Sequence, residues 1–457
     1  MVLARLTSKP ALLVLPVLLL FIIAYHLSSN HHFPTPTIPQ LSVPRHCSPN
    51  LARLQQLKLS AEINYGRAAI NVRYAASTSQ PEQFQLPLPE FNKMRVHEHV
   101  EGSEPPQCPE PFMLSYDTPP PPPDLSHIIF GAATTIDRLE ASFYDFAHWI
   151  SGTNALLYAI LEPAAAPDIE RLKERAKSMG FRLTVEESEL DWHRRYFTLT
   201  RRFYEHHTST TKWGIIIDDD TFFISPTRLS SFLASFDHTQ KYYIGGVTED
   251  FGQIKNFGIF GYGGASNILS IPLLAELNGL YDVCVKEETG GDIMLARCLY
   301  GHTGTKLTME HRLHQFDMNG DLSGIYESGR RRPQMLSVHH WKSWHQANMT
   351  NMAAVSSVCG DECLLQRFKF ADGWWLTNGY SLVKYSKDLS LDDVTIEHTW
   401  RENGDYWHSF DPLRPKDEGK TSLRLELVER TENSVSQFYV QRKEGLDHVF
   451  EMVWTTT

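Results

Sequence analysis

The sequence lacks an excess of positive charge. Its 43 Lys and Arg residues stand against 54 Asp and Glu, a formal net charge of −11. Proteins that bind nucleic acid use basic surfaces to displace counterions from phosphates. The composition therefore argues against a nucleic-acid partner. A hydrophobic share of 42% and a charged share of 21% are ordinary for a globular protein, and 457 residues are enough for one large domain or two smaller ones.

A long run without charged residues lies near the N-terminus. Arg5 and Lys9 precede ALLVLPVLLLFIIAYHL, which extends from Ala11 to Leu27. At about 1.5 Å per residue this run suits a thin internal membrane, and positive charge before it predicts a cytosolic N-terminus and a lumenal body. The alternative is a cleaved signal peptide, but SSNHHF follows rather than an A-x-A-like cleavage site. We favour a retained anchor, and both interpretations send the rest of the chain into the secretory pathway.

Cysteine is scarce, with six residues in the chain. The oxidising secretory compartment suits disulfides, and we predict the pairs Cys284–Cys298 and Cys359–Cys363 among the 15 pairings that six cysteines allow. The Cys-x3-Cys spacing of the second pair also suits half of a zinc site, but no second half with suitable spacing follows. The sequence Asn348-Met349-Thr350 is a glycosylation sequon.

Residues 28–124 are rich in Pro, Ser and His and end in the five prolines Pro119 to Pro123. Such a composition is stiff, extended and poor at forming a core, so we predict a stem, with a short helix within Leu51 to Tyr65. The full division that we predict is a cytosolic tail, an anchor, a stem, a catalytic domain and a C-terminal β-rich extension: 1–10, 11–27, 28–124, 125–350 and 351–457.

From Ser126 the pattern alternates between strands and helices. HIIFGAAT, ALLYAIL, FRLTVEE and WGIII read as strands, with RLEASFYDFAHWI, DIERLKERAKSMG and Asp191 to about His207 as the helices between them. This alternation predicts an α/β fold with a mostly parallel sheet covered on both faces. Ligands of such sheets bind beyond the carboxyl ends of the strands, where Asp218, Asp219 and Asp220 follow WGIII.

Further along, we predict a strand in KYYIGGV, another at Ile259 to Tyr262, and a tight turn at Gly263 and Gly264. Ser270 and Pro272 suit a helix start, and TGGDIMLARCLYG predicts another helix that begins near Asp292. From about Asn351 onwards, clusters such as WWLTNGYSLVKY and QFYVQR predict a smaller antiparallel β region.

The three consecutive aspartates are the strongest chemical signal. An Asp-x-Asp at a strand end presents two carboxylates to one divalent ion, and a hard cation such as Mn²⁺ or Mg²⁺ would relieve their repulsion and hold a diphosphate. The alternative is an acidic turn that leads into a helix capped near Ser225 and Pro226. We favour the metal and nucleotide site, because three aspartates directly after WGIII are hard to explain as a turn.

Other polar residues carry two interpretations each. Asp292 suits a general base or a helix N-cap, and His339 and His340 suit metal ligands or structural histidines. Gly263 and Gly264 could let a sugar approach the backbone or simply turn the chain. The run Arg330-Arg331-Arg332 reads more readily as a solvated basic loop than as a contact to an anionic donor.

The order of these motifs resembles the Fringe-like branch of glycosyltransferase family 31. DDDTFF after a strand, then GYGGAS, GGDIMLARCL and SVHHWK carry the resemblance, which spans roughly residues 126–345. The resemblance implies a nucleotide-diphosphate-sugar fold of the GT-A type, inverting β-1,3 transfer from a UDP-sugar, and a type II membrane protein of the Golgi or endoplasmic reticulum. KLTMEHRLHQFDMNGDLSG and the aromatic tail are similar to members with a C-terminal β extension.

The resemblance also implies roles for single residues. Asp220 and His339 match the metal ligands, with His340 as the alternative in the next register, and Asp218 matches the aspartate that faces the nucleotide. Asp219 lies between these two aspartates and could serve in either role. Asp292 matches the general base. The remaining matches are nucleotide contacts at Thr134, Thr135 and Arg138 and substrate contacts at Gly263, Gly264 and Trp341.

The sequence departs from the family pattern at two positions. Gly291 precedes Asp292 where the family often has a second acidic residue, and GGAS replaces the commoner GGAG. The second difference concerns the shape of the acceptor side of the site.

The expected activity is metal-dependent transfer of a hexose or N-acetylhexosamine to a glycan or glycoprotein acceptor. Two other functions stay open: a catalytically silent carbohydrate-binding module, and a metal-dependent hydrolase or phosphotransferase. We see no second metal cluster and no G-x-S-x-G elbow for a hydrolase.

Overall fold

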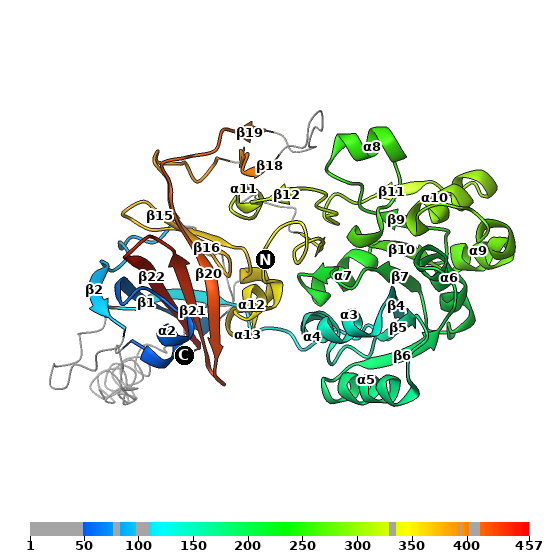
Figure 1. Ribbon diagram of the computed structural model, residues 1–457, viewed down its shortest axis with the longest axis horizontal. Helices are drawn as coiled ribbons and strands as arrows, with labels where there is room; N and C mark the ends of the chain where they lie inside the picture. The colour runs from blue at the N-terminus through cyan, green and yellow to red at the C-terminus, as the bar shows by residue number, and fades with distance from the viewer. Residues whose placement is uncertain are drawn as a thin grey trace, which may run out of the picture. The chain divides into compact units, whose positions relative to one another are not determined.

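A seven-stranded sheet forms one half of the described chain (Figure 1). The computed structural model describes residues 49–75, 83–96, 109–328, 335–393, 395–401 and 412–456. The strand order is β11-β9-β10-β7-β4-β5-β6. The bounds are β4 (Ile128–Thr134), β5 (Leu156–Leu161), β6 (Arg182–Glu187), β7 (Trp213–Ile217), β9 (Tyr243–Gly245), β10 (Asn267–Ser270) and β11 (Leu307–Met309).

Strands β4 to β7 are parallel, as predicted, and only β10 runs antiparallel to its neighbours. Every residue of β4 and β7 is buried, which suits a sheet covered on both faces. The register aligns Ala132 of β4 with Ile217 of β7. The residues that follow these two strands therefore meet at the carboxyl edge of the sheet.

Two layers of helices cover the sheet. Buried side chains of α3, α4, α5 and α7 share one core with one face, and those of α6, α9 and α10 share a second core with the other (Figure 1). Gly131 and Gly214 leave room for the ring of Phe203 on α6, because a Cβ at either would lie 2.4 Å from it. The bounds are α3 (Ile136–Ala141), α4 (Phe143–Ile150), α5 (Ala166–Ser178), α6 (Trp192–Glu205), α7 (Pro226–Leu233), α8 (Phe251–Phe257), α9 (Ile271–Cys284) and α10 (Gly291–His302).

A nine-stranded sheet forms the other half, in the order β14-β15-β16-β20-β21-β22-β1-β2 with β3 also paired to β1. Its bounds are β1 (Glu62–Tyr74), β2 (Asn92–Arg95), β3 (Phe112–Tyr116), β14 (Arg367–Lys369), β15 (Trp374–Thr377), β16 (Ser381–Lys384), β20 (Thr421–Arg430), β21 (Ser434–Gln441) and β22 (Asp447–Thr456). The antiparallel C-terminal β region was predicted and is present.

The first strands of this sheet differ from the predicted stem. Residues 62–74 form β1, which pairs in parallel with β22 and contributes Ile63, Ile70 and Val72 to the core. The composition suggested an extended stem, but apolar residues alternate along β1 and give it a buried face. Residues 28–124 therefore do not all behave as a stem, although the predicted short helix is present as α2 (Leu51–Gln56).

Short elements complete the structure. Three two-stranded pairs join β8 (Phe222–Phe223) to β13 (Ser337–Val338), β12 (Asn319–Gly320) to β18 (Trp400–Arg401), and β17 (Ile396–Glu397) to β19 (Leu413–Arg414). The short helices are α11 (Ser323–Tyr326), α12 (Met349–Ala353), α13 (Ser356–Cys359), η1 (Gly263–Ala265) and η2 (Asp361–Cys363).

Two local predictions were wrong. Ile259 to Tyr262 is not a strand, and β10 begins later, at Asn267. The predicted helix RLEASFYDFAHWI is divided into α3 and α4 at Ser142. Apart from these two differences, the strands and helices that form the cores on the two faces of the seven-stranded sheet are those that the alternating pattern predicted.

Both predicted disulfides, Cys284–Cys298 and Cys359–Cys363, are present. The apolar run at residues 11–27, Cys47, Cys108 and Arg330 to Arg332 lie outside the described residues. Within the part of the chain that the structure describes, no helix has the length and apolar character needed to cross a membrane.

Candidate active site

The three aspartates form a turn at the carboxyl end of β7. The backbone N–H of Asp218 donates to Thr221 Oγ1 at 2.9 Å, and the N–H of Thr221 donates back to the Asp218 carbonyl at 3.1 Å. Thr221 Oγ1 also donates to the carbonyl of Gly264 at 2.8 Å. Asp219 and Asp220 are each 7% exposed, so the turn holds two carboxylates largely out of water.

Asp219 is held by residues that follow β4. Continuing the register of β4 and β7 brings Thr134 level with Asp219, and the Thr134 hydroxyl donates to that carboxylate. Arg138 on α3 adds a two-pronged ion pair, with Nε and Nη2 each 2.7 Å from an Asp219 oxygen. The structure thus brings together three of the predicted nucleotide contacts, and the charge of Asp219 is neutralised by Arg138.

Asp220 faces His339 instead. Strand β13 pairs with β8 so that Val338 lies opposite Phe222, and the next residue, His339, comes level with the aspartate turn. His339 Nε2 lies 3.0 Å from Asp220 Oδ1 and 3.4 Å from Asp218 Oδ2. Two segments more than 100 residues apart in sequence are therefore joined by one short strand pair.

The His339 ring is oriented as in a metal ligand. Its Nδ1 lies 3.2 Å from the Gln315 carbonyl, which only accepts, so Nδ1 carries the proton and Nε2 faces the two carboxylates. Burial disfavours a charge on the ring, but the carboxylates of Asp218 and Asp220 outweigh burial and raise the pKa of His339 to about 10. A proton then lies on Nε2, at the position from which it would bind a divalent cation.

The same pairing acts on Asp220. Burial alone would raise the pKa of Asp220, but the hydrogen bond and the charge of His339 hold this pKa well below its ordinary value. Possible ligand atoms of Asp220, His339 and His340 all lie within 4.8 Å of one another. Carboxylate and imidazole donors at this spacing fit Mn²⁺ or Mg²⁺, with imidazole favouring Mn²⁺.

His340 is held by a second set of contacts. Its Nε2 lies 3.1 Å from Asp317 Oδ1, and its ring stacks on Trp344 with centroids 4.3 Å apart. Gln315 donates to Asp317 from Nε2 at 3.3 Å and accepts from the Ala265 N–H at 2.7 Å. Residues 315–317 therefore fix the side of the histidine pair that faces away from the aspartates.

Asp292 lies in the first turn of α10, as predicted, and touches the glycine turn. Its two carboxylate oxygens accept from the N–H groups of Gly263 at 3.0 Å and Ile293 at 2.8 Å. No ion pair to Asp292 is present among the described residues. Burial, only partly offset by these two N–H groups, raises the pKa of Asp292 to about 6, a value suited to a general base.

The glycines around Asp292 are required by close packing. A Cβ at Gly264 would lie 2.1 Å from the His339 ring, and one at Gly291 would lie 2.7 Å from Tyr196. Tyr196 thus occupies the space that a second acidic side chain before Asp292 would need, which accounts for the glycine at that position. The two turns and His339 pack directly on one another.

Ser266 carries backbone strain. Its φ is +101°, a region that favours glycine, and its buried Oγ has no hydrogen-bond partner among the described residues. The GGAS sequence therefore keeps the backbone shape that a glycine at this position would adopt easily. Strain of this kind clusters at functional sites.

The other predicted residues fall in different places. Thr135 caps α3 by accepting from the Arg138 N–H at 3.4 Å. Trp341 is only 5% exposed and packs against Phe222, so the structure places it in the core rather than at the site surface. Asn348 is exposed and caps α12.

Several residues at the carboxyl edge of the seven-stranded sheet were not predicted from the sequence. Arg195 on α6 is 6% exposed and donates to the Thr134 carbonyl at 3.3 Å, and Trp192 donates to the Ala133 carbonyl at 2.8 Å. Gln315 and Asp317 were quoted only within a resemblance. A search for polar residues on helices that face strand ends would have indicated Arg195, whereas Gln315 lies in an irregular segment without a pattern.

A model of a family described as a protein of unknown function, DUF604, matches residues 255–362. This stretch includes η1, α10 and the two histidines, and it is less than half of the chain.

Solved structures that are similar to part of this chain include glycosyltransferases. The apo form of the glycosyltransferase GlyE from Streptococcus pneumoniae TIGR4 is 11% identical, over 49% of this chain and 58% of that one, with a TM-score of 0.33. The galactosyltransferase LgtC, in complex with donor and acceptor sugar analogues, is 9% identical over 48% and 87%, with a TM-score of 0.31. Mouse xyloside xylosyltransferase 1 is 10% identical over 40% and 84%, with a TM-score of 0.29. Scores this low carry no conclusion about activity.

Proposed function

We propose that this chain is a metal-dependent glycosyltransferase that moves a hexose or N-acetylhexosamine from a UDP-sugar to a glycan hydroxyl. The main support is the division of carboxylates at one sheet edge. Asp220 is paired with His339 at 3.0 Å, while Asp292 has backbone N–H partners and a raised pKa of about 6. Asp220 and His339 suit the binding of a divalent cation, whereas Asp292 suits the acceptance of a proton.

The donor would bind at the turn that follows β7. Asp220 and His339 would hold a divalent ion, with Asp218 beside them, and such an ion, when bound, neutralises charge on the diphosphate. Arg138 pairs with Asp219 and so keeps this carboxylate directed away from an incoming anion. Arg195 adds a buried positive charge next to the carboxyl end of β4.

Asp292 would act as the general base. It removes the proton from the acceptor hydroxyl, and the oxygen attacks the anomeric carbon from the face opposite to the diphosphate. The bond between that carbon and the phosphate oxygen breaks, and UDP leaves with the electron pair. A single displacement inverts the configuration, so an α-linked donor yields a β-glycoside, and the family resemblance suggests a β-1,3 linkage.

The test follows UDP release by the full-length chain from a panel of UDP-sugars, each mixed with oligosaccharide acceptors, with Mn²⁺ and with chelator. We expect one donor to be consumed and the reaction to stop with chelator. Asp220→Asn should weaken Mn²⁺-dependent UDP binding by about 10–100-fold, whereas Asp282→Asn, at a carboxylate that is 85% exposed, should not.

Other results would favour the alternatives. UDP release without any acceptor sugar would favour a hydrolase, and UDP binding without turnover on any donor and acceptor pair would favour a silent binding module. Absence of Mn²⁺-dependent UDP binding would overturn the proposal. The full chain is needed because β1 belongs to the nine-stranded sheet.

We also propose that the chain is a single-pass type II protein of the Golgi or endoplasmic reticulum membrane. The support is the apolar run at residues 11–27 with Arg5 and Lys9 before it. Intact microsomes should protect the catalytic region from added protease, and digestion without detergent would contradict this orientation.

A further inference from the structure

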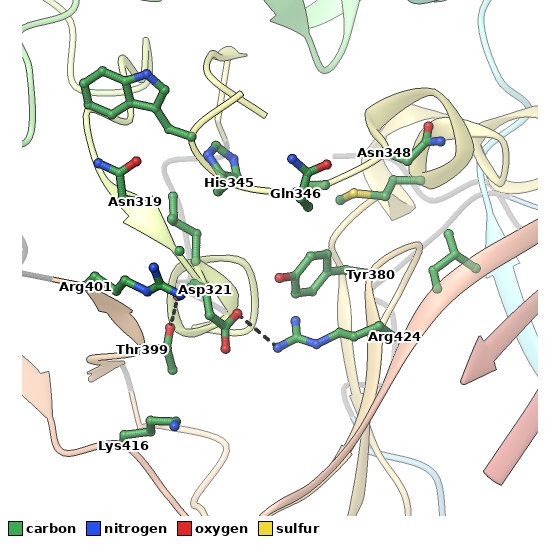
Figure 2. Close-up of a pocket in the computed structure, with 16 residues that line it drawn as sticks. Asn319, Asp321, His345, Gln346, Asn348, Tyr380, Thr399, Arg401, Lys416 and Arg424 are labelled. Carbon is green, nitrogen blue, oxygen red and sulfur yellow. Dashed lines mark hydrogen bonds and ion pairs between the residues drawn. The ribbon is translucent and has the colours of Figure 1, made fainter. Parts of the chain in front are cut away.

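A pocket with a volume of about 760 Å³ lies beside the candidate active site. Figure 2 shows its lining. One wall comes from residues 319–322, 344–348 and 352, and the other from residues of the C-terminal β region, among them Tyr380 and Arg424. The volume is within the ~300–1,000 Å³ range of small-molecule sites.

Two residues that line the pocket, Trp344 and His345, contact His340. Trp344 lines the pocket, and its ring stacks on His340 at 4.3 Å between centroids. His340 in turn lies within 4.8 Å of Asp220 and His339 as a possible ligand group. A molecule in the pocket would therefore lie next to the residues proposed to bind the donor.

The polar lining suits hydroxyl groups. Asn319 and Gln346 contribute amides, which donate and accept, and Asp321 contributes a carboxylate. In Figure 2 the hydroxyl of Tyr380 points between His345 and Asp321. Groups that both donate and accept, arranged around a cavity, match the alternating donors and acceptors of a sugar.

His345 adds an unsatisfied polar atom to this wall. Its side chain is 3% exposed, and Nε2 lies 3.1 Å from the Tyr326 hydroxyl. The buried Nδ1 has no hydrogen-bond partner among the described residues. A buried polar atom without a partner costs free energy.

The charges of the lining favour an uncharged ligand. Arg424 lies 3.3 Å from Asp321 and 3.3 Å from Glu327, and Lys416 lies 3.2 Å from Glu418. Two of the three cationic side chains of the lining are thus matched by carboxylates, and no ion pair to the third, Arg401, is present among the described residues, so the lining offers a polyanion one cation rather than three. Aromatic rings of Trp344 and Tyr380 supply apolar surface for the C–H faces of sugar rings.

We propose that this pocket binds the non-reacting units of an uncharged oligosaccharide acceptor. The proposal rests on the transferase function proposed above and identifies its acceptor as a chain of several sugars. It gives the C-terminal β region a direct part in acceptor selection, because that region supplies one wall of the pocket.

The test measures binding of labelled, uncharged oligosaccharides of increasing length to the full-length chain. N-glycans are removed enzymatically beforehand, because Asn348 lines the pocket and a glycan on it would compete. The variant Tyr380→Phe/Gln346→Ala removes one hydroxyl and one amide from the lining. Its matched control is Tyr144→Phe/Gln240→Ala, at two exposed positions outside the lining.

We expect longer oligosaccharides to bind more tightly than short ones, and the pocket variant to bind about tenfold more weakly, as two lost hydrogen bonds predict. The control variant should bind like the wild type. UDP binding with Mn²⁺, measured in parallel, reports on folding and on the donor site.

Two results would overturn the pocket assignment: equal oligosaccharide binding by the pocket variant and the wild type, or no oligosaccharide binding by a wild type that binds UDP. Preference for acidic oligosaccharides would also contradict it. Oligosaccharide binding at the pocket without any UDP binding would instead support the pocket and refute the transferase, so the two failures are distinguishable.

Discussion

Two carboxylates, the buried Glu397 in the C-terminal β region and the half-buried Asp292 at the edge of the seven-stranded sheet, have opposite surroundings. Glu397 is fully buried and has two cations, Lys420 at 2.9 Å and Arg414 at 3.1 Å. Asp292 has only backbone N–H groups as partners and a pKa raised to about 6. The charge of Glu397 is neutralised by cations, whereas Asp292, unlike Asp219 and Asp220 at the same site, has no cationic partner among the described residues.

This difference has a physical meaning. A buried carboxylate with cationic partners stays ionised and contributes to the unique packing of its region. A carboxylate without a cation is closer to its protonated form and is ready to exchange a proton near neutral pH. Each prediction below tests one side of this contrast.

The largest effect is expected for Asp292→Asn. The amide cannot accept the proton of the acceptor hydroxyl, so transfer should fall by about 10²–10⁴-fold, while UDP binding with Mn²⁺ stays near the wild-type level. UDP release and UDP titration measure the two quantities. Equal loss of both would show that Asp292 holds the structure rather than performing the chemistry.

Lys420→Met tests the buried carboxylates that have cationic partners. It leaves the buried carboxylates of Glu397 and Glu327 without this shared cation, and the free energy of unfolding should fall by about 3–5 kcal/mol. Denaturant unfolding measures it. The matched Lys93→Met, whose ion pair with Glu62 is exposed and 3.9 Å long, should cost only about 0–1 kcal/mol. Similar values for both lysines would show that the buried network adds nothing.

The two disulfides allow a smaller comparison between the same regions. Cys284–Cys298 closes 14 residues and joins α9 to the helix that carries Asp292, whereas Cys359–Cys363 closes only four. Loop entropy predicts losses of about 3 and about 2 kcal/mol when each pair is replaced by serines. Thermal unfolding measures both. A larger loss for Cys359–Cys363 would mean that strain or packing, rather than loop length, determines how much each disulfide stabilises the protein.

The smallest effect is the pH dependence. Protonated Asp292 cannot act as a base, so kcat/KM should rise about tenfold per pH unit up to about pH 6 and then level off. An aspartate with its ordinary value of 3.8 would give a flat profile from about pH 5 upwards. Initial rates in overlapping buffers at constant ionic strength distinguish the two profiles.

The parallel strands of the seven-stranded sheet were predictable because each is a short apolar run between helical segments. Their carboxyl ends locate Asp218 to Asp220 and Thr134 without further information. The contact of Asp220 with His339 was not predictable from spacing alone. It depends on the two-residue pair of β8 and β13, and two residues are too few to leave a periodic pattern.

Other errors have different causes. Composition predicted a stem over residues 62–74, where the structure has a strand; the alternation of apolar residues along this stretch, which the prediction did not use, would have indicated it. Ile259 to Tyr262 is apolar enough for a strand, but Asn267 to Ser270 pairs with both β7 and β9 instead. The family resemblance implied a substrate contact at Trp341, but this residue is only 5% exposed and its ring packs on Phe222.

The pairing of β1 with β22 has a consequence for synthesis. Asn64 lies beside His448, 384 residues later, so β1 leaves the ribosome long before its partner exists. At about 5–20 residues per second the interval is roughly 20–80 s. During that time β1 can pair only with β2 and β3 of its own chain, and the edge that later pairs with β22 is open to other chains. Completion of the nine-stranded sheet therefore waits for the end of translation.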